Sequence, residues 1–283
     1  MMKRTTTLAV FVAFFLVGLM FPFPVFSQVL NEPWGVYEDW SSNLIRPSRW
    51  IGRVDQGLEV KREIEKNQLA MRYRMTGSRS LDTGYTGGFN RLLARNGAQI
   101  NQIEADFKIK DYTVAGVSGN PSNTRVRPAA ISLAAFNDGT STGPGDMNGD
   151  YFVRVMVNRE AGSSDPVGVF RVQAFIFRCI DAQCSNASGD IHDLNVGTVR
   201  VGKWFTLRAI WDAPNNSFWV GVNNDPDVVL SYDGIVDDQI PPAQPNADVR
   251  MQLVAANSTG TPAETGAEIV VGQVRTNQSA VIP

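Results

Sequence analysis

Short segments in which apolar and polar residues alternate recur along most of the chain, separated by clusters of Gly, Asn, Asp and Pro. A period of two places successive side chains on opposite faces of a β-strand. In the segment 69–75, apolar side chains alternate in this way with Arg72 and Arg74, which share the opposite face. Many short strands bounded by turn residues are typical of an all-β domain.

Further strands are expected at 100–110, 129–136, 151–158, 168–178, 196–201, 204–211, 218–222, 249–255 and 268–275. Helical periodicity is scarce, and short helical turns are expected only at 91–97 and 236–240. Strands do not alternate with helices, which disfavours a parallel sheet. The pattern instead predicts two antiparallel sheets packed face to face, with few short helices.

The first residues have the order of a secretory signal, in which a basic start precedes an apolar run and then small residues. Lys3 and Arg4 come before an uncharged apolar run at 8–21, which two prolines follow. Proline ends a helix, and the run is shorter than the roughly 20 apolar residues of a membrane span. We therefore expect a signal peptide at 1–27, cleaved after Ser27.

Residues 28–283 are expected to form a single β-sandwich domain with no membrane span, exported to the periplasm or the extracellular space. β-domains of about 200–250 residues commonly fold as one unit. The formal net charge of the whole chain is −2, and the sequence contains no basic stripe. A nucleic-acid partner is therefore not expected.

The chain has two cysteines, Cys179 and Cys184, which are close in sequence. In an exported protein such a pair is expected to form a disulfide. The alternative, a zinc site, needs further soft ligands, and the only histidine is His192.

Two segments carry a resemblance to a known family. Residues 202–212 (GKWFTLRAIWD), a polar turn and residues 217–222 (SFWVGV) are similar to the late hairpin of the concanavalin A-like lectin/glucanase superfamily. Residues 102–109 (QIEADFKI) also resemble a strand in the middle of a sheet of that superfamily. The resemblance implies an antiparallel jelly-roll sandwich. It does not select an activity, because the superfamily includes lectins, hydrolases, lyases and structural domains.

Laminarinase-type hydrolases of this superfamily carry three carboxylates on one face of a strand, where they act as nucleophile, orienting group and acid. Glu104 and Asp106 match the first two positions, but the third falls on Lys108 or Ile109. These two carboxylates are therefore weak catalytic candidates. The alternative is a solvated strand face where they neighbour lysines and cross-strand arginines such as Arg72 and Arg74.

Polysaccharide lyases of this architecture use Tyr and His, with Arg or Gln on a concave sheet. His192 is the corresponding weak catalytic candidate, in an expected loop at 189–194 with an aspartate on either side. Neighbouring carboxylates raise the pKa of a histidine and orient its ring. The alternative is an ordinary surface histidine.

The segment 146–150 (DMNGD) is similar to the first half of a calcium loop, although it lacks the later positions of an EF-hand. Asp146, Asn148 and Asp150 are therefore candidate ligands of Ca²⁺, the one cofactor that the sequence suggests. The alternative is an ordinary polar turn.

Three tryptophans near the start of the expected domain, Trp34, Trp40 and Trp50, are candidate platforms for stacking on sugar rings. Together with Arg72 and Arg74 they form the predicted ligand-binding set. The alternative is that these aromatic side chains belong to the core.

The sequence leads to one principal function and two alternatives. The principal hypothesis is a secreted, non-catalytic module that binds a polysaccharide or another glycan. The first alternative is a polysaccharide-degrading hydrolase or lyase, and the second is a structural or adhesive surface protein.

Overall fold

The computed structural model describes residues 32–54, 59–79, 84–115, 124–184, 187–232 and 238–282, so the expected signal peptide lies outside the described residues. Two antiparallel sheets contain all the strands of these segments. The first, sheet A, has the order β13-β12-β11-β6-β15-β4-β3, with β1 also paired to β15. The second, sheet B, has the order β10-β9-β8-β7-β14-β5-β2. The predicted all-β, two-sheet jelly-roll sandwich is confirmed.

The strands of sheet A are β1 (Trp34–Glu38), β3 (Glu59–Glu65), β4 (Gln68–Thr76), β6 (Gln102–Ala115), β11 (Trp204–Asp212), β12 (Ser217–Val222), β13 (Val228–Ser231) and β15 (Glu264–Asn277). Those of sheet B are β2 (Trp50–Val54), β5 (Tyr85–Ala94), β7 (Arg125–Asn137), β8 (Asp150–Glu160), β9 (Val169–Cys179), β10 (Ala187–Arg200) and β14 (Ala247–Ala256). The helices of the described residues are three short 3₁₀ turns, η1 (Gly97–Gln99), η3 (Ala213–Asn215) and η4 (Gln278–Ala280).

The two segments that carry the family resemblance lie side by side in sheet A. Strands β11 and β12 form the expected hairpin, which closes where Asp212 pairs with Ser217. On its other edge β11 pairs with β6, so the two segments are direct neighbours. Sequence similarity at two distant places thus corresponds to one continuous part of the sheet.

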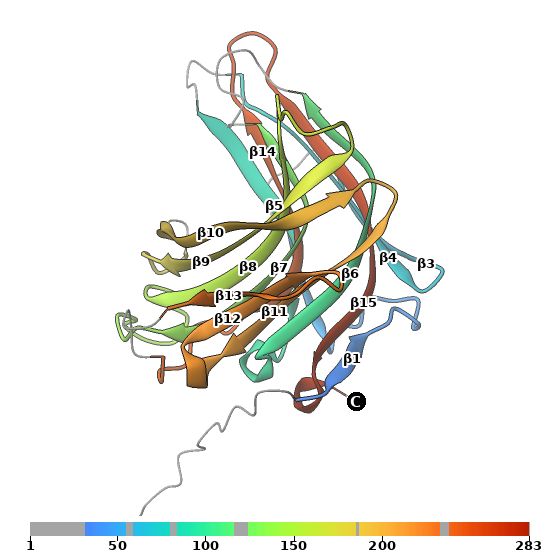
Figure 1. The fold of residues 1–283 in the computed structure, drawn as a ribbon. Helices are drawn as coiled ribbons and strands as arrows, with labels where there is room; N and C mark the ends of the chain where they lie inside the picture. Colours follow the sequence, from blue (N-terminus) through green and yellow to red (C-terminus); the bar gives the residue numbers. More distant parts are fainter. Residues whose placement is uncertain are drawn as a thin grey trace, which may run out of the picture.

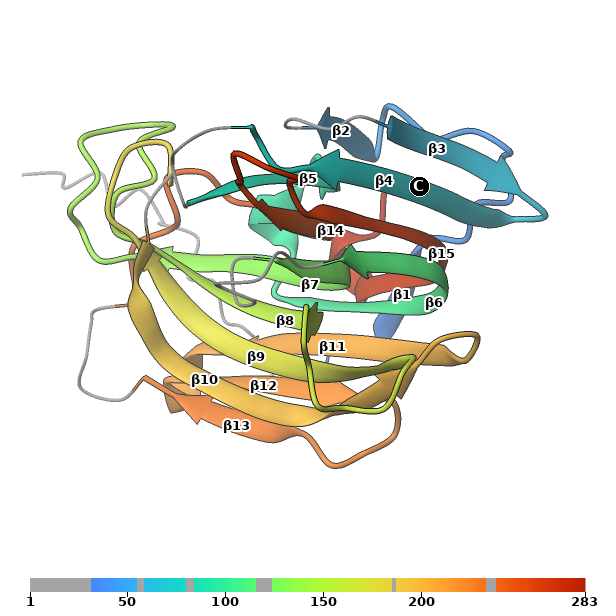
Figure 2. The same ribbon diagram turned by 90° about the horizontal axis from the view of Figure 1, so that it is seen from above.

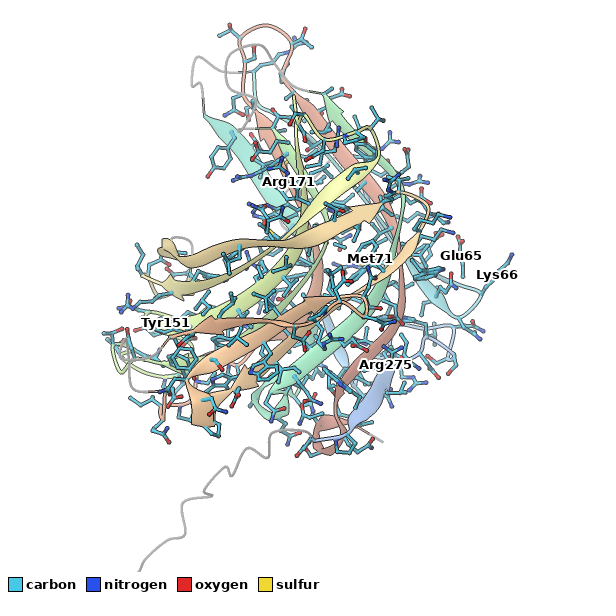
Figure 3. The ribbon with its side chains drawn as sticks, viewed as in Figure 1. Glu65, Lys66, Met71, Tyr151, Arg171 and Arg275 are labelled. Atoms are coloured by element: carbon cyan, nitrogen blue, oxygen red, sulfur yellow. A yellow bond between two sulfur atoms is a disulfide. The ribbon has the colours of Figure 1, made fainter. Side chains whose placement is uncertain are left out.

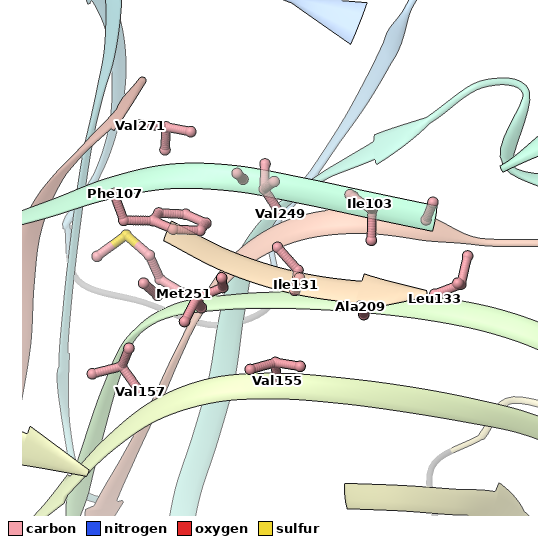
Figure 4. Close-up of a cluster of buried hydrophobic side chains, with 14 of the residues drawn as sticks. Ile103, Phe107, Ile131, Leu133, Val155, Val157, Ala209, Val249, Met251 and Val271 are labelled. Carbon is pink, nitrogen blue, oxygen red and sulfur yellow. The ribbon is translucent and has the colours of Figure 1, made fainter. Parts of the chain in front are cut away.

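The main core lies between the sheets, where each strand buries alternate side chains. In β8, Val153, Val155 and Val157 are fully buried there. Figure 4 shows Val155 and Val157 with Phe107 and Met251, which come from opposite sheets. Burial of apolar area on both inner faces holds the two layers together.

Sheet B is strongly bent. In Figure 1, β5 and β14 rise steeply, whereas β8, β9 and β10 run almost horizontally. Figure 2, seen from above, shows the two layers and the curved path of β8, β9 and β10. The outer face of sheet B is therefore concave where the sheet bends.

Two local expectations are wrong. Residues 91–94 continue strand β5, and only 97–99 form a short 3₁₀ turn where a helical turn was expected at 91–97. His192 lies in strand β10, opposite Ile176 of β9, and not in a loop. A second helical turn was expected at 236–240, and its described residues, 238–240, contain no helix.

The strand at 91–94 has a physical reason. Leu92 is buried between the sheets and its strand pairs with β14, and these contacts override the weak helical pattern of 91–97.

The predicted disulfide is confirmed. Cys179, the last residue of β9, is bonded to Cys184, with their Cα atoms 4.8 Å apart. Within the described residues, no helix is long and apolar enough to cross a membrane.

Replacing Phe107 by alanine is expected to lower the free energy of unfolding by about 3–5 kcal/mol, because this ring is fully buried between the sheets and its removal leaves a cavity. Urea denaturation followed by tryptophan fluorescence measures the change. The control Lys110→Ala, on the exposed face of the same strand, should change it by less than about 1 kcal/mol. Equal losses in both variants would contradict this account of the core.

Candidate functional site

A groove with a volume of about 800 Å³ crosses the outer face of sheet B. Its lining comes from all seven strands of sheet B, with Ala187 as the contribution of β10, and from loops at one end. Neighbouring strands are about 4.8 Å apart, so these seven strands extend over roughly 29 Å. The groove therefore runs across the strands and suits an extended ligand.

Strand pairing places three arginines in one row across this face. Arg53 of β2 lies opposite Arg91 of β5, which in turn lies opposite Arg250 of β14. Residues that are directly opposite share a face of the sheet. The row continues through Ala130 and Met156, which form part of the apolar floor.

The guanidinium groups in the groove are packed on aromatic rings. The Cζ atom of Arg91 lies 4.2 Å from the ring centroid of Phe89. That of Arg154 lies 4.6 Å from the ring centroid of Phe177, and its Nε donates a hydrogen bond of 2.9 Å to the hydroxyl of Ser132. A cation over an aromatic face is stabilised by the ring quadrupole.

A carboxylate and an amide position two further arginines. Arg250 donates from Nε and Nη2 to the two oxygens of Asp248, which is fully buried. Arg127 donates from Nη1 to the Oε1 atom of Gln252 at 2.9 Å. These contacts fix the directions in which the guanidinium groups point.

Nε of Arg125 and Oδ1 of Asn158 are buried polar atoms in the groove that lack hydrogen-bond partners among the described residues. Leaving a buried donor or acceptor unsatisfied costs about 1–3 kcal/mol. A ligand oxygen in the groove would accept from Nε of Arg125, and a ligand hydroxyl would donate to Oδ1 of Asn158.

One end of the groove is formed by the disulfide loop. Met147 donates its backbone N–H to the carbonyl of Ala182 inside this loop. Met147 and Cys184 also pack on the apolar cluster of the groove floor. The disulfide therefore shapes the groove.

Glu104 and Asp106 lie on the opposite side of the molecule, on the outer face of sheet A. Glu104 forms ion pairs with both Arg208 and Arg275, and Asp106 pairs with Arg275 at 3.1 Å. Figure 3 shows Arg275 on the β1 side of the molecule. The two carboxylates thus occupy a cross-strand ion-pair network and do not line the groove.

Arg72 and Arg74 also lie on sheet A, outside the groove. Arg72 pairs with Glu268 at 2.6 Å and with Glu59 at 3.1 Å, which raises the pKa of its guanidinium through hydrogen bonds to these carboxylates. Arg74 pairs with Glu59 at 3.5 Å. Neither arginine is the cross-strand partner of Glu104, a position that Arg208 and Arg275 occupy.

The structure places two of the three candidate tryptophans in the core. Trp40 is 0% and Trp50 is 3% exposed, and their rings stack with centroids 5.9 Å apart. Their rings present no free face for a sugar and are part of the hydrophobic core. Trp34 is half-buried in β1, outside the groove lining.

The candidate calcium ligands are engaged in protein hydrogen bonds. Asp146 accepts from the backbone N–H and hydroxyl of Thr142 at 2.8 and 2.7 Å, which lowers the pKa of its carboxyl group. Asp150 accepts from Asn137 and from two backbone N–H groups, although burial raises its pKa. Asn148 donates its backbone N–H to Asp146. In the described part of the chain, no three His, Cys, Asp or Glu side chains gather where they could hold a metal ion.

The position of the His192 side chain lies outside what the structure describes, and only its place in β10 is known. None of the six groove arginines belonged to the predicted ligand-binding set. They come from β2, β5, β7, β8 and β14, and only the strand pairing brings them together.

Glu104→Gln is expected to lower the free energy of unfolding by about 1–3 kcal/mol, because it weakens charge-assisted hydrogen bonds to two arginines. It should leave the binding of any ligand in the groove of sheet B unchanged. Chemical denaturation and a binding assay test the two parts. The exposed Glu63→Gln, which breaks the pair with Lys61, is the control and should change stability by under about 1 kcal/mol. Loss of binding without loss of stability in Glu104→Gln would assign this residue to a site.

The double variant Cys179→Ala/Cys184→Ala is expected to lose about 2 kcal/mol of stability, since the disulfide closes only a short loop. A reducing agent should destabilise the native protein by a similar amount and leave the double variant unaffected. Thermal unfolding with and without the reductant provides the measurement. A reductant effect on the double variant would contradict this interpretation.

No protein-family model and no curated protein matches the sequence. Similar solved structures include a β-1,3-glucanase from Mycobacterium marinum, at 13% identity and a TM-score of 0.43, covering 86% of this chain and 96% of that chain. The carbohydrate recognition domain of Emp46p, in a potassium-bound form, has 12% identity and a TM-score of 0.38, with coverages of 85% and 98%. The lectin UEA-II complexed with galactose has 12% identity and a TM-score of 0.36, with coverages of 86% and 99%. Similarity at this level concerns the path of the chain and says nothing about which residues act.

Proposed function

We propose that the protein is an exported, non-catalytic polysaccharide-binding sandwich whose ligand lies in the groove of sheet B. The observation that carries this proposal is the groove itself, which crosses seven strands and is lined by guanidinium and amide groups. Its extent of roughly 29 Å suits several consecutive sugars. A chain laid across the strands would contact side chains from each of them.

The polar lining suits sugar hydroxyls, each of which both donates and accepts hydrogen bonds. Amide side chains at several positions provide matching donors and acceptors: Asn158, Gln173, Gln183, Gln244, Asn246 and Gln252. Asn158, Gln173 and Gln252 lie on strands of the sandwich, which keeps them in place before the ligand arrives. Such preorganisation reduces the entropy lost on binding.

A binding role is favoured over glycoside hydrolysis by the carboxylates of the groove. Hydrolysis ordinarily needs two of them on either side of the scissile bond. Among the described lining residues, Glu160 is the one carboxylate. The nearby Asp248 is buried beneath Arg250 and holds it by two hydrogen bonds.

Export is supported by the disulfide. A bond between two cysteines persists in oxidising compartments outside the cytoplasm. Cys179 and Cys184 form such a bond at the groove, so its shape depends on the compartment. Extracellular and periplasmic glycans would be accessible there.

Affinity electrophoresis against a panel of neutral and acidic polysaccharides tests the proposal. We expect retardation by at least one of them, and Asn158→Ala should weaken that interaction by about 3–10-fold, the value of one hydrogen bond. Asn101→Ala is a matched control, because its Oδ1 atom is also buried without a partner among the described residues but lies outside the groove.

Failure to bind every polysaccharide in the panel would overturn the proposal. Release of reducing ends, or of unsaturated products that absorb in the ultraviolet, would replace the binding role by an enzymatic one. Equal weakening by Asn158→Ala and Asn101→Ala would move the site away from sheet B.

A further inference from the structure

The groove on sheet B carries a charge opposite to that of the whole chain. The formal net charge of the protein is −2, yet six arginines line the groove: Arg53, Arg91, Arg125, Arg127, Arg154 and Arg250. Among the described residues that line the groove, Glu160 is the one carboxylate, and Asp248 is hydrogen-bonded to Arg250. The groove is therefore a concentrated positive field on an otherwise mildly acidic protein.

The arginine row repeats at the spacing of the strands. Arg53, Arg91 and Arg250 occupy three adjacent strands in direct register, so their Cα atoms follow one another at about 5 Å. Like charges opposite each other destabilise a sheet. Asp248 offsets the charge of Arg250, whereas Arg53 and Arg91 lie directly opposite each other. A negative group placed over these two arginines would remove their mutual repulsion.

Two of the six arginines are available to a ligand. The guanidinium groups of Arg53 and Arg125 make no ion pair with the described residues, and Arg53 is exposed. Arg154 is held between aromatic rings and Ser132, where desolvation and then the charge of Arg250 lower the pKa of its guanidinium. An anion placed here would stabilise the charged guanidinium of Arg154 against both its desolvation and the charge of Arg250.

We propose that the ligand is a polyanionic polysaccharide with an acidic group, a carboxylate or a sulfate, on successive sugars. This inference rests on the proposed function and specifies its substrate class. A pyranose unit in an extended glycan repeats on a length similar to the strand spacing of about 5 Å, so acidic groups on successive sugars would lie near Arg53 and Arg91 of adjacent strands. The planar guanidinium binds carboxylate and sulfate oxygens through two parallel hydrogen bonds.

The aromatic rings of the groove favour a glycan over a single-stranded nucleic acid. Bases bind such grooves by stacking on exposed aromatic faces. Phe152, Phe175 and Phe177 are at most 7% exposed, and the guanidinium of Arg154 covers Phe177. Arg91 likewise lies over Phe89. The rings support arginines and leave no stacking platform for bases.

The test uses two probes with one backbone, polygalacturonate and its fully methyl-esterified form, in calorimetric titration at low and at high salt. We expect the acidic polymer to bind at least about tenfold more tightly than the ester, with an affinity that falls as salt screens the ion pairs. Dextran sulfate and dextran form the corresponding pair for sulfate. Single-stranded DNA is the control polyanion that is not a polysaccharide.

The variant Arg53→Gln/Arg125→Gln should weaken binding of the acidic polymer at least about tenfold. The matched control is Lys61→Gln/Arg74→Gln, which removes the same charge from exposed positions on sheet A. Circular dichroism and thermal unfolding establish that both variants fold. If both weaken binding equally, net charge alone is responsible and the groove is not the site.

The remaining outcomes separate this inference from the proposed function. Equal binding of polygalacturonate and its ester, or binding of dextran alone, would retain a polysaccharide-binding protein and overturn its specificity for acidic groups. Absence of binding to all four polysaccharides would overturn both. Tighter binding of DNA than of either acidic polysaccharide would make a nucleic acid the partner.

Discussion

Each strand of the sandwich gives alternate side chains to the core between the sheets, and this burial dictates what the other face of the strand presents. In β8, the inward positions of Val153, Val155 and Val157 force Phe152, Arg154 and Met156 outward. A shift of one residue would bury the arginine between the sheets and expose the valines. The composition of the groove is therefore fixed by the same apolar contacts that hold the fold together.

The bend of sheet B gives this outward face its chemical character. A concave surface brings side chains from different strands closer together than a flat one would, and here it gathers guanidinium groups over an apolar floor. The low dielectric of such a floor strengthens both the repulsion between neighbouring charges and their attraction to an anion. Aromatic rings and the buried Asp248 keep the arginines in place without neutralising all of them.

The fold could be predicted further than the site. Alternation gave most of the strands, and the two similar segments at 102–109 and 202–222 proved to be neighbours in sheet A. The arginines were not recognisable as a group, because a basic stripe in sequence requires neighbours along the chain, whereas Arg53, Arg91 and Arg250 are neighbours only through pairing. The helical interpretation of 91–97 also removed Arg91 from the sheet. Glu104 and Asp106 attracted notice because they are close in sequence, and their partners Arg208 and Arg275 come from two other strands.

The outer faces of the two sheets both carry arginines, but they differ in how the arginine charges are paired. On sheet A, arginines and carboxylates alternate across the strands, so that Arg208 and Arg275 are neutralised by Glu104 and Asp106. On sheet B, Arg53 and Arg125 have no such partner among the described residues. A neutral polar side chain at position 53 would remove the repulsion with Arg91 at no cost to the core, since Arg53 is exposed. Proteins break a rule of local stability chiefly where function requires it. The contrast between the two faces therefore argues that the charge of the groove is retained for what binds there.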